Sequence, residues 1–431
     1  MSEAVPQIYT DLDIDPGKLD RNALKVVATL KEADFDAYLV GGCVRDLLAG
    51  GTPKDFDVAT NATPEEVKTL FRRARLVGRR FPIAHVRFGR ELIEVSTFRQ
   101  GALEHVETNA TGLIVKDHVF GSMAEDAFRR DFTINALYYD TETNAVIDYV
   151  NGVDDIQHGR LQFIGDPQSR LAEDPVRMLR AIRFAAKLDL HMDERLTDLY
   201  DETAERLEAI PGARLFDEFM KMFLTGYGAQ VWNLLRDTPL VRSLFPSCNP
   251  DNPLVLAAMQ NTDSRIAEDQ PVTPGFLIAV LLWDDFEQRH ERDNPRGKPD
   301  VTYEIAMDTL AVQQQHIAVP KRFSIFAREV WQLQARLEAR QPKFIKRLLG
   351  HKRFRAAFDF LVLRAEQEEK LRSKANWWHD IQEQDAEGQE RMISQLSKGK
   401  GKGKGGKGRR RNANQPSFPS DSHGSNGPYE Y

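Results

Sequence analysis

The first 150 residues combine helical and strand-like patterns of apolar side chains. Four apolar residues at helical spacing predict a helix over residues 21–32: Leu24, Val27, Ala28 and Leu30. An apolar run at residues 37–40 predicts a buried strand that ends at a glycine pair. Alternating runs at 83–88 and 92–98, separated by Gly89-Arg90, predict a β-hairpin. We therefore expect a mixed α/β head over residues 21–150, after a loose, acidic lead-in at residues 1–20.

The pattern becomes helical from about Leu171 onward and stays so through Arg391. Turn-forming residues interrupt it at 249–253 and again at 292–299. These breaks predict a helical neck at residues 151–245 and a helical C-terminal body at residues 246–397. The expected fold class is α+β, with a mixed sheet and its helices followed by an all-α body.

Composition changes this picture only at the end of the chain. Of 431 residues, 41% are apolar and 29% charged, which is ordinary for a globular protein. The net charge is −6, but residues 398–411 carry eight basic and no acidic side chains, so the rest of the chain sums to −14 (−6 minus +8). Residues 398–431 hold almost no apolar side chains, which predicts a disordered basic tail.

Cysteine usage and hydropathy predict where the protein works. Two cysteines, Cys43 and Cys248, in so long a chain favour a reducing compartment. The longest apolar stretch, near residues 276–283, is far shorter than the roughly 20 residues of a membrane-spanning helix. The N-terminal residues do not follow the pattern of a signal peptide. We expect a cytoplasmic protein with no membrane partner.

Residues 39–57, LVGGCVRDLLAGGTPKDFD, contain the most informative chemistry. A glycine pair between a strand and a helix lets the backbone approach a phosphate closely, although such pairs are most often only turns. Asp55 and Asp57 fall on a predicted strand, 55–59, where alternate side chains share a face. Two carboxylates on one face suit Mg²⁺, although an Asp-X-Asp sequence is often a solvated strand edge. A phosphate cradle beside a metal-binding pair predicts phosphoryl or nucleotidyl transfer.

A third carboxylate lies on the second strand of the predicted hairpin. Strand alternation leaves Glu94 two orientations, toward the aspartate pair or toward solvent as an ordinary surface residue.

Four segments in this order carry a family resemblance: LVGGCVRD, KDFDVAT, RRDFTINALYYD and EDPVRMLRAIRFAAKL. With them the chain resembles the bacterial class II nucleotidyltransferases, which comprise tRNA CCA-adding enzymes and bacterial poly(A) polymerases on a polymerase-β-like head. The resemblance is strong over residues 20–230. Residues 76–89 (LVGRRFPIAHVRFG) and 354–366 (FRAAFDFLVLRAE) are similar to the polyadenylating branch.

The resemblance implies template-independent transfer of AMP from ATP to RNA 3′ ends, with release of pyrophosphate and possible partners among RNA-decay proteins. It implies two Mg²⁺ ions bound by Asp55 and Asp57, and it adds Asp131 as a third catalytic carboxylate. A helix cap is the structural alternative for Asp131, and Glu94 is the alternative third carboxylate. The competing functions are CCA addition to tRNA and RNA binding by a degenerate, non-catalytic protein.

The resemblance also implies a set of residues that bind the nucleotide: Gly41, Gly42, Arg45, Arg130, Asp174, Arg177 and Arg180. Asp174 and Arg177 would read the base, and Arg180 would reach phosphate or ribose. The structural alternatives are an Arg45–Asp46 ion pair, Asp174 as a helix cap, and an ion-pair ladder along the helix.

Arg129 and Arg130 are adjacent, so they cannot both point at one ligand. We expect Arg130 to face the nucleotide and Arg129 to pair with Glu125 or Asp126.

We predict that deletion of residues 398–431 weakens RNA binding and flattens its salt dependence. Each neutralised phosphate on single-stranded RNA contributes about −0.7 to the slope of log K against log salt. If half of the eight basic groups engage, the slope falls in magnitude by roughly 3. RNA affinity at several salt concentrations tests this, and identical slopes for the full and shortened chains would make the tail a solubility appendage only.

Overall fold

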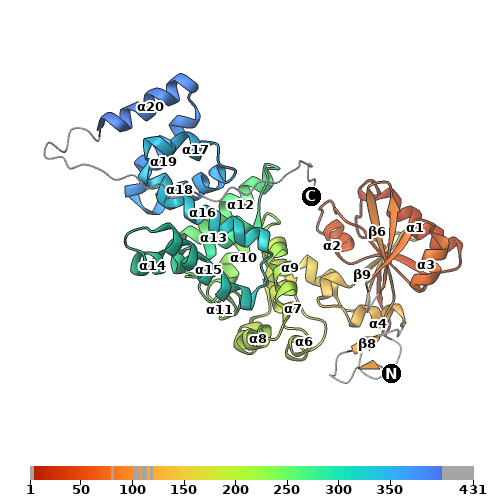
Figure 1. Cartoon of the computed structure of the whole chain (residues 1–431). Coiled ribbons are helices and arrows are strands. Elements are labelled where there is room, and N and C mark those ends of the chain that lie inside the picture. Colours follow the sequence, from red (N-terminus) through yellow and green to blue (C-terminus); the bar gives the residue numbers. More distant parts are fainter. Residues whose placement is uncertain (1–3, 79–81, 101–106, 109–113, 117–119, 400–431) are drawn as a thin grey trace, which may run out of the picture.

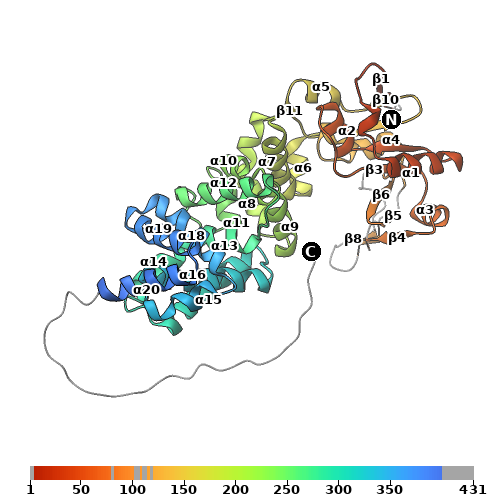
Figure 2. The ribbon, with the colours of Figure 1, turned by 90° about the horizontal axis from the view of Figure 1, so that it is seen from above.

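The computed structural model describes residues 4–78, 82–100, 107–108, 114–116 and 120–399. The tail expected to be disordered is residues 398–431. Beyond Gly399 these residues lie outside the described part of the chain. Both views of the ribbon show an elongated molecule with the sheet-containing head at one end, α6–α9 next to it, and α20 at the far end (Figures 1 and 2).

The head is built on one eight-stranded sheet, with order β1-β10-β9-β2-β3-β6-β5-β4. Only the β3–β6 pair is parallel among the pairings within this sheet; the others are antiparallel. The strands in spatial order are β1 (Gln7–Tyr9), β10 (Ala145–Asp148), β9 (Leu137–Asp140), β2 (Ala37–Val40), β3 (Asp57–Thr60), β6 (Glu91–Thr97), β5 (Ile83–Phe88) and β4 (Ala74–Val77).

Two expectations about the start of the chain need correction. The lead-in is not loose throughout, because β1 pairs with β10 and forms one edge of the sheet. The strand expected at residues 55–59 begins at Asp57, so Asp55 precedes it. The predicted hairpin is confirmed as β5 and β6.

Five helices accompany the sheet: α1 (Arg21–Glu32), α2 (Gly42–Leu48), α3 (Pro64–Leu70), α4 (Met123–Phe128) and α5 (Gly152–Gln157). The Asp20 carboxylate caps α1 by accepting hydrogen bonds from two backbone N–H groups. The helix has the predicted bounds, but Ala28 is exposed, and the buried face is formed by Ala23, Val26, Val27 and Leu30.

The two faces of the sheet have different cores. Helices α1, α2 and α3 pack on one face with Leu39, Val58 and Val95. On the other face, Val40, Ala59 and Tyr138 pack with residues of α4 and with Ile164. Strand alternation produces this division, because neighbouring residues along β2 and β3 point to opposite faces.

The neck contains α6 (Pro167–Glu173), α7 (Val176–Leu188), α8 (Tyr200–Leu207), α9 (Gly212–Phe223), α10 (Gly228–Leu235) and α11 (Leu240–Leu244). Short two-stranded pairs are formed by β11 (Arg160–Leu161) with β12 (His191–Met192) and by β7 (Glu107–Thr108) with β8 (Ile114–Lys116). The 3-10 helices are η1 (Pro16–Lys18), η2 (Thr133–Asn135), η3 (Glu194–Leu199) and η4 (Pro342–Phe344).

The body contains α12 (Pro253–Ala267), α13 (Pro274–Leu281), α14 (Trp283–Asp293), α15 (Pro299–His316), α16 (Lys321–Ala339), α17 (Ile345–Leu349), α18 (Phe354–Gln367), α19 (Glu369–Gln382) and α20 (Ala386–Gly399). The two predicted breaks fall before α12 and before α15. Within the described ranges, no helix combines the length and apolar character needed to cross a membrane.

We expected a domain boundary at residue 245, but the hydrophobic core continues across this position. One hydrophobic cluster runs from Phe132 and Phe163 through the neck helices to Trp331 and Leu363. A separate cluster begins at Leu333 and holds α17, α18 and α19 together. The neck and the first half of the body therefore pack as one unit, although the domain limits stay a prediction.

Candidate active site

Gly41 makes a turn at the end of β2 that a larger residue would strain. Its φ of +75° lies in the left-handed region that favours glycine. A Cβ atom there would lie 3.4 Å from Arg130 Nη1 and 3.5 Å from the Asn135 carbonyl oxygen. Gly42 then begins α2, and Arg45 follows on its first turn. The backbone here is thus closely packed against the RRDFTIN segment.

Asp55 and Asp57 flank a buried residue, Phe56, and both are exposed. Asp57 opens β3 and lies directly opposite Glu94 on the parallel strand β6. The Asp57 carboxyl keeps access to solvent, but protein surrounds most of it. Burial, followed by repulsion from Glu94, raises its pKa to about 6; Arg130 opposes this shift and Asp55 adds to it.

This cluster has the donor chemistry of a magnesium site. Asp55, Asp57 and Glu94 offer carboxylate oxygens, the ligands that Mg²⁺ prefers. Burial and then repulsion from Glu94 raise the pKa of Asp57, and a bound cation would relieve this repulsion. In the described part of the chain, no three acidic, histidine or cysteine side chains are close enough together to form a complete metal site. The residues fit a site whose remaining oxygens come from substrate and water.

Asp131 lies apart from this pair, in an ion pair with the neck. Arg180 of α7 donates from Nε to Asp131 Oδ2 at 2.8 Å, and the Phe132 backbone N–H donates to Oδ1 at 2.9 Å. Burial by itself would raise the pKa of Asp131, but the Arg180 guanidinium outweighs it and lowers the pKa. Arg180 engages the Asp131 carboxylate here, and the role of Asp131 as a third catalytic carboxylate stays a prediction.

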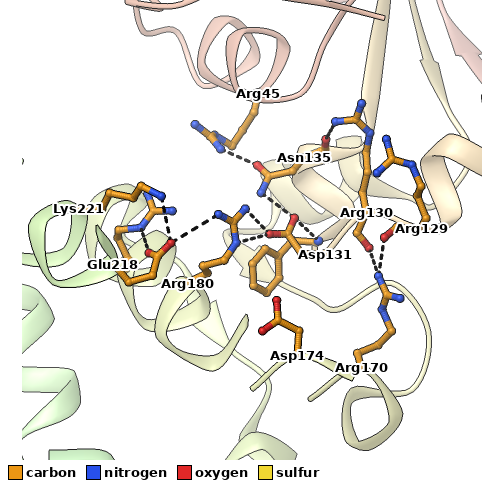
Figure 3. A network of polar contacts seen from close by, with 12 residues as sticks. Arg45, Arg129, Arg130, Asp131, Asn135, Arg170, Asp174, Arg180, Glu218 and Lys221 are labelled. Carbon is orange, nitrogen blue, oxygen red and sulfur yellow. Dashed lines mark hydrogen bonds and ion pairs between the residues drawn. The ribbon is translucent and has the colours of Figure 1, made fainter. Parts of the chain in front are cut away.

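A continuous chain of polar contacts links α2 to α9 through this ion pair (Figure 3). Arg45 Nη1 donates to Asn135 Oδ1 at 2.6 Å, and Asn135 Nδ2 donates to Asp131 Oδ1 at 3.3 Å. On the far side, Arg180 Nη1 lies 4.0 Å from the buried Glu218 carboxylate. The head and the neck thus share one charged network.

Arg45 Nε also donates a hydrogen bond to Asp46 Oδ1 at 2.8 Å. The Arg45–Asp46 ion pair, which was the structural alternative, is therefore present, and Arg45 also lies on the helix that begins at Gly42. Arg45 is 4% exposed. Sequence reasoning missed Asn135, whose only signal was its place within the RRDFTIN motif.

Both adjacent arginines pair with the buried carboxylate of Asp126. Arg129 does so as expected, and Arg130 Nη2 donates to Asp126 Oδ2 at 2.9 Å. The Arg130 guanidinium lies over the Tyr138 ring and lowers the pKa of Asp57. Arg130 is therefore the member of the pair that is directed toward the aspartate cluster.

Arg177 and Arg180 lie three residues apart on α7, whereas Asp174 precedes the helix and its side chain accepts a hydrogen bond from the Val176 backbone N–H at 3.2 Å. Asp174 lies outside α7 in an extended conformation and pairs with Arg214. Arg177 Nη1 donates to Glu173 at 2.6 Å and to the Arg170 carbonyl oxygen. The alternative of an ion-pair ladder is thus partly observed, with Glu173 as its acidic member.

Three guanidinium groups surround one aromatic ring on α7. Arg45, Arg180 and Arg183 lie 5.1, 5.5 and 4.3 Å from the centre of the Phe184 ring. Nearby, burial lowers the pKa of Lys187. The junction of α2 and α7 therefore gathers four cationic side chains, each with an acidic partner: Arg45, Arg180, Arg183 and Lys187. Sequence reasoning assigned none of Arg183, Phe184 and Lys187 to the nucleotide site.

Comparisons with known proteins agree with this geometry. Residues 37–162 match the family model described as the poly A polymerase head domain, residues 189–251 match "Probable RNA and SrmB- binding site of polymerase A", and residues 298–416 match the arginine-rich C-terminus of polymerase A. The chain is 44% identical to poly(A) polymerase I of Salmonella typhimurium over 88% of this chain and 86% of that protein. It is 40% identical to poly(A) polymerase I of Haemophilus influenzae over 90% of each chain.

More distant relatives are CCA-adding enzymes. That of Lactobacillus helveticus is 38% identical over 51% of this chain and 53% of its own. In fold, the chain is similar to the Thermotoga maritima CCA-adding enzyme complexed with tRNA, with a TM-score of 0.59 and 20% identity over 85% of each chain.

The aspartate pair, the glycine turn and the cationic neck helix define a nucleotidyltransferase. Within that class, the chain belongs to the poly(A) polymerase family. The prediction of a polyadenylating enzyme, in preference to a CCA-adding one, is confirmed by the greater identity and coverage of the poly(A) polymerase relatives. The expected α+β fold is confirmed as well.

We predict that Arg180→Met lowers the free energy of unfolding by about 1–3 kcal/mol at pH 7, because it leaves the mostly enclosed Asp131 carboxylate without a counter-charge. In an Asp131→Asn background the same change should cost clearly less, since no uncompensated charge remains.

The pH dependence follows from the lowered pKa of Asp131. The stability that the pair supplies is present above the unfolded-state pKa of about 3.9 and is lost as the pH falls below it. Thermal and denaturant unfolding of the wild type, both single variants and the double variant would test this. Equal costs of Arg180→Met in the two backgrounds would contradict it.

Proposed function

We propose that this protein extends RNA 3′ ends by transferring AMP from ATP without a template, and that Asp55 and Asp57 are its metal-binding carboxylates. The observation that supports this most directly is the placement of Asp57 between the Gly41 turn and Glu94 on β6. Asp57 therefore has a phosphate-binding environment on one side and a further carboxylate on the other.

Two Mg²⁺ ions, when bound by Asp55 and Asp57, would lower the pKa of the RNA 3′-hydroxyl and stabilise the leaving pyrophosphate. The chain's own residues position the substrates. Glycines at positions 41 and 42 would let a triphosphate approach the backbone closely, and the Arg130 and Arg45 guanidinium groups provide positive charge beside this turn.

We favour Glu94 over Asp131 as the third carboxylate at the metal site. Glu94 is directly opposite Asp57 and contributes to its raised pKa. Asp131 is bound to Arg180, so its role in this proposal is to hold the neck arginine in position. In the same proposal Arg180 and Arg183 face the nucleotide from α7.

The base would be read by Asp174 and Arg177, as the family resemblance implies. Each has an ion-pair partner here, Arg214 and Glu173 respectively. A carboxylate and an arginine fork offer both acceptor and donor groups to a base edge. Binding RNA through the helical body and the basic tail, a cytoplasmic location and association with RNA-decay proteins complete the proposal.

We predict that Asp57→Asn and Asp55→Asn abolish incorporation of labelled AMP into a generic RNA. Glu94→Gln should lower kcat by roughly 10²–10³-fold, because it removes a charge that acts at the reacting centre. Asp131→Asn should lower kcat less and should raise the KM for ATP through the freed Arg180. Near-wild-type turnover of Asp55→Asn or Asp57→Asn would contradict the metal assignment. A larger loss of kcat for Asp131→Asn than for Glu94→Gln would identify Asp131, and not Glu94, as the third carboxylate.

We predict that Arg177→Ala loosens base choice, whereas Arg45→Ala raises the KM for ATP without altering selectivity. Base contacts discriminate between nucleotides, and phosphate contacts are common to all of them. Incorporation from each nucleoside triphosphate separately measures both effects, with Arg45→Lys as the charge-retaining control. Unchanged ATP preference and turnover in Arg177→Ala would remove it from base reading.

The same assay separates the competing functions. Long adenosine tracts support polyadenylation, addition limited to CCA on tRNA would indicate the related activity, and no incorporation would indicate a binding protein.

A further inference from the structure

The strand register extends the aspartate site across the sheet as a row of polar side chains. Asp57 of β3 lies opposite Glu94 of β6, Glu94 lies opposite His85 of β5, and His85 lies opposite Arg75 of β4. Residues directly opposite one another on neighbouring strands point to the same face. The row therefore runs in one line from the metal-binding pair to the edge strand of the sheet.

This face of β6, β5 and β4 is open among the described residues. The alternate side chains of these strands, such as Ala84, Val86 and Val95, are buried against α3 on the other face. On the open face Arg75 and Arg87 are exposed, and His85 and Glu94 are partly exposed with His85 Nε2 3.4 Å from a Glu94 oxygen. Figure 2 shows these strands on the opposite side of β3 from α2 and α5.

The outer end of the row is an arginine cluster, formed by Arg72, Arg73, Arg75 and Arg87. They line a hollow of about 310 Å³ at the sheet edge, and all four are exposed. Arg73 precedes β4 at the position opposite Arg87 if the β4–β5 register is continued by one residue. Within the described part of the chain none of the four has an acidic partner, in contrast to the arginines of the nucleotide site.

Unpaired arginines at this density are unusual in a chain whose residues outside the 398–411 segment sum to −14. Like charges held close together without counter-charges favour a polyanion. A guanidinium also matches the geometry of phosphate better than an ammonium does.

The two sides of Asp57 have different occupants in the proposed function. The β2 side holds Gly41, Arg45 and Arg130, and it is closed by the contact between the head and α7. If the nucleotide fills that side, the RNA 3′ end must reach the metal from the β6 side. The RNA would then lie along the open row.

We propose that the open face of β6, β5 and β4 is the track for the 3′-terminal segment of the acceptor RNA, and that Arg73, Arg75 and Arg87 bind its phosphates. This inference rests on the proposed function. Arg75 lies three strand spacings from Asp57, or roughly 14 Å at about 4.8 Å per spacing. The cluster therefore binds phosphates a few nucleotides upstream of the reacting hydroxyl and reads no base sequence.

The test is a triple variant, Arg73→Ala/Arg75→Ala/Arg87→Ala, in the full chain. Loss of three phosphate contacts should reduce the salt slope of single-stranded RNA binding by roughly 2, and the affinity by up to about 100-fold at 0.1 M salt. The KM for RNA should rise in parallel, while the KM for ATP and kcat at saturating RNA stay near wild type.

A matched control removes three exposed charges from the helices that cover the opposite face: Arg21→Ala/Lys25→Ala/Lys68→Ala. It should leave the RNA slope within error of wild type. The same slope for both triple variants would overturn the proposal, as would wild-type RNA affinity in the arginine variant.

A second readout distinguishes RNA from the other polyanion of the reaction. If the arginine variant weakens inhibition by pyrophosphate and leaves the KM for RNA unchanged, the cluster serves the leaving group and the track is wrong. RNA binding is measured without ATP and therefore does not depend on catalysis. If the wild-type protein binds RNA along this face but incorporates no nucleotide, the proposed function is refuted and the RNA track is not.

Discussion

The ion pair between Asp131 and Arg180 is the constraint on which the arrangement of the site depends. It joins the head to α7, the helix that presents Arg180, Arg183 and Phe184 to the glycine turn. A buried pair of this kind adds little net stability compared with an apolar contact, but breaking it is costly. The ion pair therefore mainly determines the position at which the head and the neck meet, and it contributes little to the net stability of their contact.

Further polar contacts extend this constraint from α2 of the head to α9 of the neck. Asn135 connects Asp131 to Arg45, and Glu218 continues from Arg180 into α9. A change in the position of α7 would consequently be transmitted to the glycine turn through these contacts. In the proposed function, this network is the reason that Arg45, on a short helix of the head, and Arg180, on a long helix of the neck, act on one nucleotide.

The sheet supplies the other half of the site through its register. The parallel pairing of β3 with β6 places Glu94 beside Asp57. One face of the sheet is filled by α1, α2 and α3, and the other is covered at β9, β2 and β3 but, among the described residues, open toward β4. In the two proposals made above, the closed side takes the small substrate and the open side the long one.

The sequence by itself determined the local elements and the nature of the chemistry. The helix at Arg21–Glu32, the Gly41 turn, the β5–β6 hairpin and the breaks in the helical half all follow from patterns that act over a few residues. The Asp55–Asp57 pair could be recognised for the same reason, since its carboxylates are neighbours in the chain.

Tertiary structure alone decided which distant groups meet. The family resemblance favoured Asp131 as the third carboxylate and left Glu94 as the alternative, because strand register and ion-pair partners depend on contacts between residues far apart in the chain, such as Asp57 with Glu94 and Asp131 with Arg180. Sequence spacing alone also does not reveal that α7 begins at Val176, after Asp174, or that Asp174 pairs with Arg214 and Arg177 with Glu173. The pairing of β1 with β10 and the row from Asp57 to Arg75 likewise have no local signal, because hydrogen bonding between strands is set by the sheet as a whole.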